Sequence, residues 1–420
     1  MTEPLRLAIV GCGGMGRRHL AGLGELRRGG RRDVELVAVC DPRLDNAEFL
    51  AAEAEQLLRA RPEVFGDAET MVARVSGLEA ADCTTDTRSH HEVAPQLFDL
   101  GLHVLCEKPL ALTIRGCHRV IEAADRRGRV LSVAENFRRD PMNRLVRALI
   151  DGGAIGDPQF ILEAGVAGGD AITITPWRHL KMGGVLPLDA GVHSADILQY
   201  YFGPVERASG QIRIFEPRRH RRQTAGPGGF YERWAQDMPE VMDADGEDAI
   251  FGLLEFASGA LGQWIDHHAG HGLPFHARKV FGTRGSIEAP GDRNGRPPRL
   301  ILDDGTDVGD ERLLEFAPGY QLDEVAASLF GADRPWRYGF DFETTDRKLI
   351  GLEYQEFAAC VREGVAPEVD GATALRDVAL VYALFESARA GRQVTVAEVR
   401  EGGLDGYQRE IDMQLGLAAR

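Results

Sequence analysis

Short apolar runs alternate with amphipathic stretches along the first third of the chain. Between residues 5 and 136 the runs are LRLAIVG, ELVAVCD, AADCTTD, HVLCE and VLSVAEN. Segments with the spacing of an amphipathic helix, such as LDNAEFLAAEAEQLLRA, lie between them. Strands that alternate with helices of about 10–15 residues are typical of βαβ units, whose strands form a parallel sheet. The pattern therefore predicts an N-terminal domain of this kind over residues 1–136.

Beyond residue 136 the pattern changes to strands joined by short turns. The runs are PQFILEAG, ASGQIRIF, HARKVFGTRGSIEA and RLILDDG, and two helical stretches, KLIGLEYQEFAACVREG and ATALRDVALVYALFESARAG, follow. Turn pairs such as SG and RG are typical of hairpins. We predict a second α/β domain over residues 137–420, with a large open, mostly antiparallel sheet and C-terminal helices that can pack back on the first domain. Residues 216–246 lack periodicity and predict an insertion loop.

Composition and charge narrow the class of partner. The 420 residues are 44% apolar and 27% charged, with a net charge of −16. No apolar run approaches the ~20 residues that span a bilayer, and this charge would repel phosphates. We expect a small-molecule partner, no nucleic acid and no membrane. The absence of a basic leader predicts a cytoplasmic protein. The six cysteines form no CxxC pair, so we expect buried reduced thiols.

A glycine-rich turn follows the first predicted strand. In GCGGMG, Gly11, Gly13 and Gly16 fit G-x-G-x-x-G, and Gly14 and Met15 complete the turn. Glycines let the backbone approach a pyrophosphate, which then sits at the helix N-terminus. The alternative is a turn that merely reverses the chain. The strand–turn–helix context favours a dinucleotide site.

Asp41 ends the second predicted strand, in AVCDPR. Its carboxylate could accept hydrogen bonds from a ribose diol. Arg43 could neutralise the 2′-phosphate of NADP, but Asp41 would repel that phosphate. We expect NAD as the cofactor, with NADP as the alternative.

Two further segments carry groups suited to proton and hydride chemistry. Lys108, one of four lysines in the chain, follows the strand HVLCE, and ligands of an open parallel sheet bind at the carboxyl ends of its strands. Asp189 and His193 are four residues apart in LDAGVH, which would place them on one face of a helix. A histidine beside a carboxylate suits proton transfer. The plainer alternatives are a surface lysine paired with Glu107, and an N-capping aspartate beside a core histidine.

The combination of GCGGMG, CEKP and GGVLPLDAGVH, in this order, resembles the Gfo/Idh/MocA family of nicotinamide-dependent oxidoreductases. The resemblance extends to LLEFASGALGQW, VFGTRGSIEA and the ATALRDVALVYALFESARAGRQV tail. It implies a Rossmann domain followed by an α/β domain, and activity on a sugar, cyclitol or related polyol. It also implies that Lys108, Asp189 and His193 form the catalytic group.

The same resemblance implies the neighbours of the cofactor and the substrate. For the cofactor these are Thr85, His90, Glu107, Lys108 and Asn136, in addition to the glycine turn and Asp41. For the substrate they are Trp177 and Arg178 beside the catalytic group. Asp86 stands where the family commonly has proline, which leaves the path of that loop open.

Two clusters of basic side chains have less specific interpretations. In DHHAGHGLPFH, His267 and His271 could hold a metal if the segment were helical, but its glycines and proline favour a loop. We expect no metal, and we count His271 among the substrate contacts. The basic run 218–222 could receive an anion, although a solvated loop is favoured.

Three functions remain open. The leading one is an NAD-dependent dehydrogenase that oxidises a secondary hydroxyl of a sugar, sugar derivative or cyclitol. The second is a redox-assisted glycosidase, in which NAD is regenerated after oxidation, elimination and re-reduction. The third is a non-catalytic NAD-binding regulator, which the presence of Lys108, Asp189 and His193 disfavours. An open sheet with one uncovered face also predicts a homo-oligomer, a dimer or tetramer.

Overall fold

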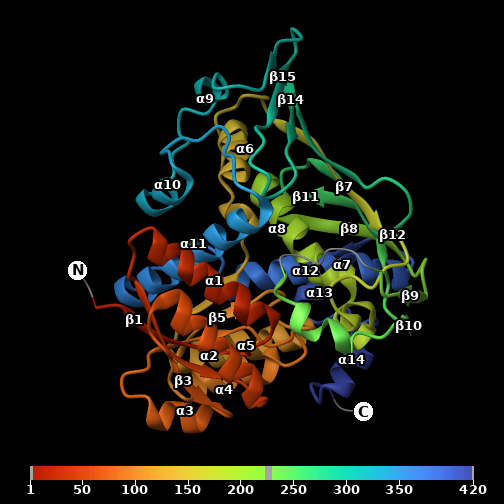
Figure 1. Cartoon of the computed structure of the whole chain (residues 1–420). Coiled ribbons are helices and arrows are strands. Elements are labelled where there is room, and N and C mark those ends of the chain that lie inside the picture. Colours follow the sequence, from red (N-terminus) through yellow and green to blue (C-terminus); the bar gives the residue numbers. More distant parts are fainter. Residues whose placement is uncertain (1–2, 223–228, 419–420) are drawn as a thin grey trace. The chain divides into compact units, whose positions relative to one another are not determined.

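The computed structural model describes residues 3–222 and 229–418 (Figure 1). The chain divides into two compact units. The first comprises residues 1–136, 225–236 and 346–375, and the second comprises residues 137–224, 237–345 and 376–420. Each unit has its own sheet.

The first unit is built on a six-stranded parallel sheet in the order β3-β2-β1-β4-β5-β6. The strands are β1 (Leu5–Val10), β2 (Val34–Cys40), β3 (Glu63–Phe65), β4 (Ala80–Cys83), β5 (His103–Glu107) and β6 (Leu131–Ala134). The helices between them are α1 (Gly14–Arg28), α2 (Leu44–Leu58), α3 (Ala68–Arg74), α4 (His90–Asp99) and α5 (Ile114–Arg127). The order reverses beside β1, which is where dinucleotides bind in such sheets. The predicted Rossmann fold is confirmed.

Local sequence explains why these elements form. Leu7, Ala8 and Ile9 of β1 are fully buried, as expected for a central strand covered on both faces. Helix α5 begins where the Thr113 side chain accepts a hydrogen bond from the Gly116 amide, and its αL cap lies at Gly128, which can adopt a positive φ without strain. Helix α5 therefore starts and stops at residues suited to capping.

Part of the C-terminal sequence belongs to the first unit. Most of α11 (Phe342–Glu363) and the first turn of α12 (Gly371–Ala390) lie within residues 346–375. The Val133 amide donates to the Val369 carbonyl over 2.9 Å, beside strand β6. Gly22 of α1 lies so close to α11 that an added Cβ would be 2.5 Å from Ile350. These contacts attach a distant part of the sequence to the first sheet.

The second unit contains a nine-stranded sheet in the order β16-β15-β14-β13-β7-β12-β11-β8-β17. Its strands are β7 (Pro158–Gly168), β8 (Val205–Arg213), β11 (Ala249–Phe256), β12 (Leu261–Gly270), β13 (Phe275–Gly282), β14 (Gly285–Ala289), β15 (Arg299–Leu302), β16 (Asp307–Val308) and β17 (Val394–Thr395). The pair β7–β12 is parallel, and the other pairs are antiparallel. The prediction of a large, mostly antiparallel sheet is confirmed.

The remaining helices of the second unit were in part missed by the sequence pattern. They are α6 (Pro141–Asp151), α7 (Val185–Asp189), α8 (Gly191–Phe202), α9 (Leu313–Phe316), α10 (Glu324–Phe330), α13 (Val396–Arg400) and α14 (Arg409–Gln414), with 3₁₀ turns η1 (Phe137–Arg139), η2 (Pro176–His179) and η3 (Lys181–Gly183). Five of these helices, namely α7, α9, α10, α13 and α14, span only four to seven residues and leave little periodicity to detect.

The two faces of the large sheet differ. On one face α12 packs closely, because a Cβ at Gly210 or Gly252 would lie 2.6 or 2.7 Å from Leu384. The opposite face carries Leu253, Leu261 and Phe281, which the strand register places on one side and which are 62%, 56% and 40% exposed. One face of the sheet is thus covered and the other presents apolar side chains.

The segment 216–246 contains regular structure that the sequence did not predict. Strands β9 (Arg218–His220) and β10 (Val241–Asp243) pair antiparallel, and the 3₁₀ turn η5 covers Glu232–Asp237. Residues 223–228 of this segment lie outside the described residues. The expectation of a solvated basic run is wrong for Arg219. Its guanidinium is fully buried, pairs with Asp248 over 2.8 Å and donates to the Gly169 carbonyl.

Two further expectations concern the state of the cysteines and the lack of membrane-spanning helices. All six cysteines are buried and free of disulfides, as expected. Within residues 3–222 and 229–418, no helix combines the length and apolarity needed to cross a membrane.

Candidate functional site

The glycine-rich turn lies between β1 and α1 and is packed tightly on its inner side. Gly11 has a φ of +100°, and a Cβ there would lie 2.7 Å from the Thr85 amide nitrogen. A Cβ at Gly16 would lie 2.4 Å from the Gly11 carbonyl oxygen. A Cβ at Gly13, in contrast, would meet no described atom within 4 Å. The space next to the backbone is therefore open at Gly13, the N-cap of α1, where a pyrophosphate would bind.

Asp41 follows β2 and connects the turn to the start of α2. Its Oδ2 accepts a hydrogen bond from the Cys12 amide and its Oδ1 from the Arg43 amide, each over 2.8 Å. A carboxylate oxygen can accept more than one hydrogen bond, so both oxygens retain capacity for ribose hydroxyls. The residues present fit an adenosine ribose at this edge of the sheet.

The loops after β4 and β5 are joined through His90, in the first turn of α4. One ring nitrogen of His90 lies 3.0 Å from the Pro109 carbonyl oxygen and the other 3.2 Å from the Thr85 carbonyl oxygen. The Thr84 hydroxyl donates to the Gly11 carbonyl over 2.7 Å. His90 therefore positions the two loops that border the turn. Asp86, at the position that is commonly proline, accepts from the Arg88 amide.

Glu107 ends β5 and takes part in a buried charge network that the sequence did not reveal. His19 of α1 contacts Asp82 over 2.9 Å with Nδ1 and Glu107 over 3.0 Å with Nε2. The Tyr354 hydroxyl donates to the same Asp82 carboxylate. This network ties α1, β4, β5 and α11 together beneath the glycine turn. A histidine on the inward face of a predicted helix was the available sequence signal.

The charges of His19 and Glu107 shift each other's pKa. Burial alone would lower the pKa of His19, but the carboxylates of Asp82 and Glu107 raise it well above its ordinary value. Burial alone would raise the pKa of Glu107, but His19 and then Lys108 bring it below its ordinary value. We conclude that a histidine cation lies between two carboxylates.

Lys108 and Asn136 lie at the carboxyl ends of β5 and β6. Lys108 is half-buried and directly follows Glu107. The Oδ1 atom of Asn136 is buried and accepts no hydrogen bond from the part of the chain that the structure describes. A buried acceptor of this kind normally has a partner. It is suited to a donor group of a bound cofactor, and the cofactor contact that the resemblance implies for Asn136 stays a prediction.

In the second unit, Trp177, Arg178 and Asp189 form one cluster. Arg178 Nε donates to Asp189 Oδ2 over 2.7 Å, and the pair is almost completely buried. The Arg178 guanidinium also donates to the Thr175 hydroxyl and lies over the Trp177 ring at 4.3 Å. Such a geometry restrains all three side chains. Asp189 is therefore held in place as a hydrogen-bond acceptor.

His193 lies near the start of α8 and is oriented by an aromatic neighbour. Its ring stacks on Phe137 at 4.1 Å between centroids with parallel planes. Asp189 ends α7, whereas α8 begins at Gly191, so the two residues do not belong to one continuous helix. Ala190 between them keeps helical dihedrals, with a φ of −88° and a ψ of −36°, so the placement of both side chains on one helical face stays a prediction.

A second histidine, His268, lies on β12 near this cluster. Its Nε2 is 3.0 Å from Asp266 Oδ1. This is an ion-pair distance, but the angles at the two atoms do not fit a hydrogen bond. Burial would lower the pKa of His268, but Asp266 chiefly, with a contribution from Asp189, raises it. The alternation in DHHAGH does not indicate which histidine points inward, so this environment of His268 could not be predicted from the sequence.

His271 itself has a different environment. It follows β12, its side chain is 65% exposed, and its Nε2 lies 2.8 Å from Glu216 Oε1. His267 is a strand residue, so the spacing of His267 and His271 does not place them on one helical face. This removes the geometry that a metal pair would need.

One group of three possible metal ligands is present among the described residues. It consists of Cys83, His90 and Cys106. Their ligand atoms lie within 4.8 Å of one another. Contact with Cys106 is the main cause that lowers the pKa of Cys83 to about 7. Because both ring nitrogens of His90 already contact carbonyl oxygens, we assign no metal to this group.

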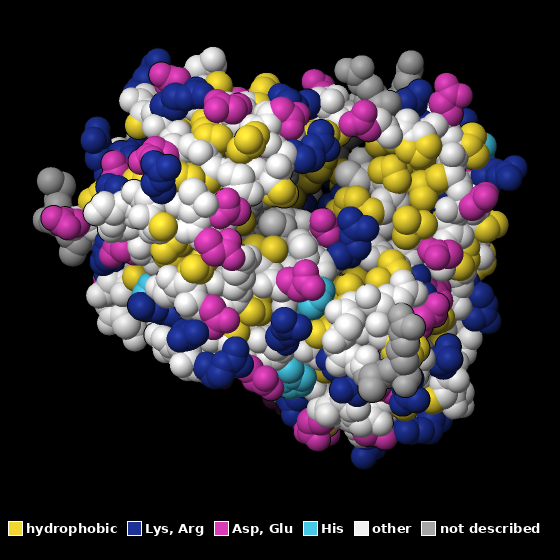
Figure 2. All heavy atoms as spheres, turned by 90° about the horizontal axis from the view of Figure 1, so that it is seen from below, with side chains coloured by type: hydrophobic (Ala, Val, Ile, Leu, Met, Phe, Trp, Pro, Cys, Tyr) yellow, Lys and Arg dark blue, Asp and Glu magenta, His cyan; other side chains and the backbone are white. Residues whose placement is uncertain are grey.

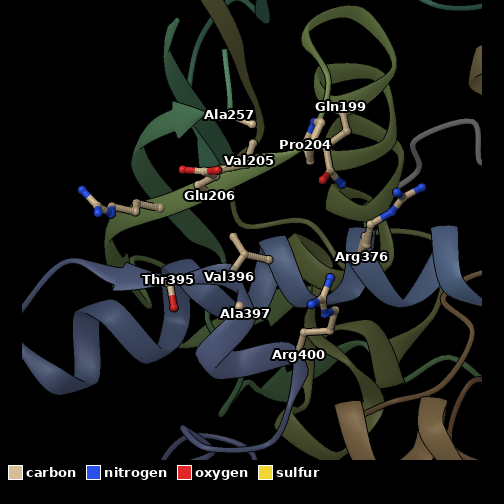
Figure 3. A pocket seen from close by; sticks show the side chains of 11 residues that line it. Gln199, Pro204, Val205, Glu206, Ala257, Arg376, Thr395, Val396, Ala397 and Arg400 are labelled. Atoms are coloured by element: carbon tan, nitrogen blue, oxygen red, sulfur yellow. The ribbon is translucent and has the colours of Figure 1, made fainter. Parts of the chain in front are cut away.

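A pocket of about 380 Å³ opens in the second unit at the ends of β8 and α8 (Figure 3). Side chains from β8, α12 and α13 line it, including Arg207, Arg376 and Arg400. None of the residues predicted to bind substrate lines this pocket. On the face shown in Figure 2, acidic and basic side chains are interspersed, so the excess negative charge forms no single large patch there.

Comparisons with known proteins agree with this geometry. Residues 5–135 match the family model of an oxidoreductase family, NAD-binding Rossmann fold, and residues 147–396 match the model of its C-terminal alpha/beta domain. An oxidoreductase from Agrobacterium radiobacter, solved in complex with NAD+, L-tartaric acid and magnesium, has the same fold. Its TM-score is 0.70 at 21% identity, with 94% of this chain and 99% of that chain covered.

Two curated relatives are similar over most of their length. The chain is 27% identical to D-apiose dehydrogenase of Paraburkholderia graminis, over 92% of this chain and 88% of the relative. It is 26% identical to scyllo-inositol 2-dehydrogenase (NAD(+)) of Bacillus subtilis, over 94% of this chain and 97% of the relative.

Proposed function

Because this chain belongs to the Gfo/Idh/MocA oxidoreductase family, we propose that it transfers a hydride between a secondary hydroxyl of a sugar, sugar derivative or cyclitol and NAD. The chain is an NAD-dependent dehydrogenase that acts on CH–OH groups, as its motifs predicted. The observation that carries the proposal is the turn at Gly13, which is open above the α1 N-terminus and linked to the Asp41 carboxylate through Cys12.

The substrate class is supported by the two curated relatives. One is named for a sugar and the other for a cyclitol, and each is similar to this chain over most of its length. Sugars and cyclitols present several hydroxyls, and a site that binds them needs fixed polar groups. The restrained pair of Arg178 and Asp189, with Trp177 beside it, supplies such groups in the second unit.

We assign three residues to the chemistry. The side-chain ammonium of Lys108 polarises the substrate oxygen. The imidazole of His193 accepts the hydroxyl proton in its neutral form. Asp189 fixes Arg178 and accepts a hydrogen bond from the substrate. NAD supplies the hydride acceptor when bound. The stacking of His193 on Phe137 supports its role, because a general base must be held in one orientation.

The same enzyme is proposed to be a cytoplasmic homo-oligomer. Six buried free cysteines suit a reducing compartment. The exposed apolar face at Leu253, Leu261 and Phe281 suits a subunit interface. Sedimentation of the purified protein tests the second point, since a monomer at all accessible concentrations would contradict it.

A substrate panel tests the proposed reaction. Free sugars, cyclitols and glycosides are each incubated with NAD, and both NADH and released aglycone are measured. We expect NADH to accumulate with at least one free sugar or cyclitol. Release of aglycone without net NADH would instead show a redox-assisted glycosidase, and NAD binding without any turnover would show a regulator.

A further inference from the structure

Gly14 is the one glycine of the nucleotide-binding turn that is not part of the G-x-G-x-x-G fingerprint. Gly11, Gly13 and Gly16 are explained by backbone packing and by approach to a pyrophosphate. Gly14, the first residue of α1, is explained by another part of the chain. A Cβ there would lie 2.4 Å from Cε1 of Tyr231, so the tyrosine ring rests directly on the Gly14 backbone.

Tyr231 belongs to residues 229–234, which are attached to α1 by a second set of contacts. Arg17, one turn into α1, donates to the Phe230 carbonyl over 2.8 Å and to the Gly229 carbonyl over 3.3 Å. The other side of the Arg17 guanidinium is held by two 2.8 Å bonds to Glu53 of α2. A planar guanidinium fixed on both edges is a rigid connection.

A third set of contacts reaches α2. Arg233 lies over the Phe49 ring at 4.4 Å and donates to the Asp45 carboxylate over 3.1 Å. Arg17 lies over the same ring at 5.2 Å. Residues 229–234 therefore extend from the first turn of α1, which is the pyrophosphate position, to the first turns of α2, which follow the ribose-binding Asp41.

We propose that residues 229–234 are a clasp that retains the bound dinucleotide, with Tyr231 packed beside the pyrophosphate as its central contact. This inference rests on the proposed function. The clasp lies beside the cofactor position and leaves the backbone at Gly13 open, as binding requires. Its principal effect is on release, because contacts formed around a bound ligand change the dissociation rate more than the association rate.

The test is a double-mutant cycle on Gly14 and Tyr231, read out as the dissociation rate of NADH without substrate. Stopped-flow fluorescence follows NADH displaced by excess NAD. We expect Tyr231→Ala to raise the rate about tenfold and Tyr231→Phe to stay within about twofold, because the ring makes the contact. Gly14→Ala displaces the ring, so it should raise the rate in the native background and add little to Tyr231→Ala.

Controls separate this role from a structural one. Arg61→Ala removes exposed ion pairs to Glu48 and Glu55 on α2, away from the clasp, and should leave NADH release unchanged. The thermal midpoint of each protein without cofactor should stay near that of the native chain, because the clasp acts on the ligand.

Several results would overturn the inference. Unchanged release in Tyr231→Ala would show that the ring does not retain the cofactor, and slower release would show that it obstructs the site. If Gly14→Ala changed the release rate equally in the native protein and in Tyr231→Ala, Gly14 would contact the dinucleotide directly and not act through Tyr231. If the native protein bound no NADH at all, the proposed function would fail together with the clasp.

Discussion

Arg178 donates a hydrogen bond to Asp189 over 2.7 Å, and both side chains are almost completely removed from water. Asp189→Asn would leave the arginine charge buried without its carboxylate, which typically costs about 3–5 kcal/mol in the free energy of unfolding. We expect Asp189→Asn to lower both this free energy and kcat/KM. Urea unfolding measures the first effect. Arg299→Ala, in the exposed pair with Asp307, should leave stability unchanged. Equal stability of both variants would contradict the account.

The histidine between Asp82 and Glu107 makes stability depend on pH in a defined direction. Its folded-state pKa is raised, so its stabilising charge is fully present below about pH 6.5 and is lost as pH rises through the folded value. The stability lost in His19→Gln should therefore be largest below about pH 6.5 and shrink as the buffer becomes alkaline. Urea unfolding at several pH values measures this, with the exposed His276→Gln as control. A loss that grows with pH would refute the assignment.

Lys108→Met removes a charge while it keeps most of the apolar stem. Turnover should fall by about 10²-fold or more, the scale of losing one electrostatic stabiliser, with the fold intact. Steady-state kinetics and circular dichroism provide the two readouts. Lys279→Met, on β13 in a half-exposed pair with Glu288, is the matched control and should retain full turnover. Near-normal turnover in Lys108→Met would remove this lysine from the mechanism.

The base role of His193 predicts a change in pH dependence. His193→Ala should lower kcat by about 10²–10⁴-fold with much less effect on NAD binding. Oxidation by the native protein should weaken on acidification, because a protonated imidazole cannot accept the hydroxyl proton. The acidic limb of the kcat/KM profile should disappear in the variant. If the limb persists unchanged, the base is Lys108 or a bound water.

Asp41 should govern the choice between the two nicotinamide dinucleotides. We expect NAD to bind more tightly than NADP, and Asp41→Ala to narrow the gap by weakening NAD binding and relieving repulsion of the 2′-phosphate. Titration with each reduced cofactor measures both affinities. Glu48→Ala, an exposed acidic position on α2, controls for a general change in charge. Equal or tighter binding of NADP by the native protein would assign the selectivity to Arg43 or another residue.

The long, periodic elements and the glycine turn could be predicted from the sequence. Strand β1 is apolar at every position except Arg6, and α5 has clear caps, so local rules suffice for both. The boundary between α7 and α8 could not be predicted, because LDAGVH has helical spacing and Ala190 itself keeps helical dihedrals.

The partners of buried charged side chains were the main feature of the structure that could not be predicted from the sequence. His19 lies on the inward face of a predicted helix and Arg219 lies in a basic run that was expected to be solvated, and each is fully buried among carboxylates or carbonyls. Their partners, Asp82 for His19 and Asp248 for Arg219, are distant in the sequence. Only the tertiary fold brings such pairs together, so composition and periodicity carry no record of them.

The most direct test of the central claim follows hydrogen transfer to NAD itself. A sugar or cyclitol that responds in the panel is prepared with deuterium on its ring carbons and incubated with excess enzyme and NAD. The account predicts that deuterium moves from the substrate into NADH, that a ketone forms in equal amount, and that Lys108→Met slows both. Formation of NADH without deuterium, or of product without NADH, would contradict direct hydride transfer from a secondary hydroxyl.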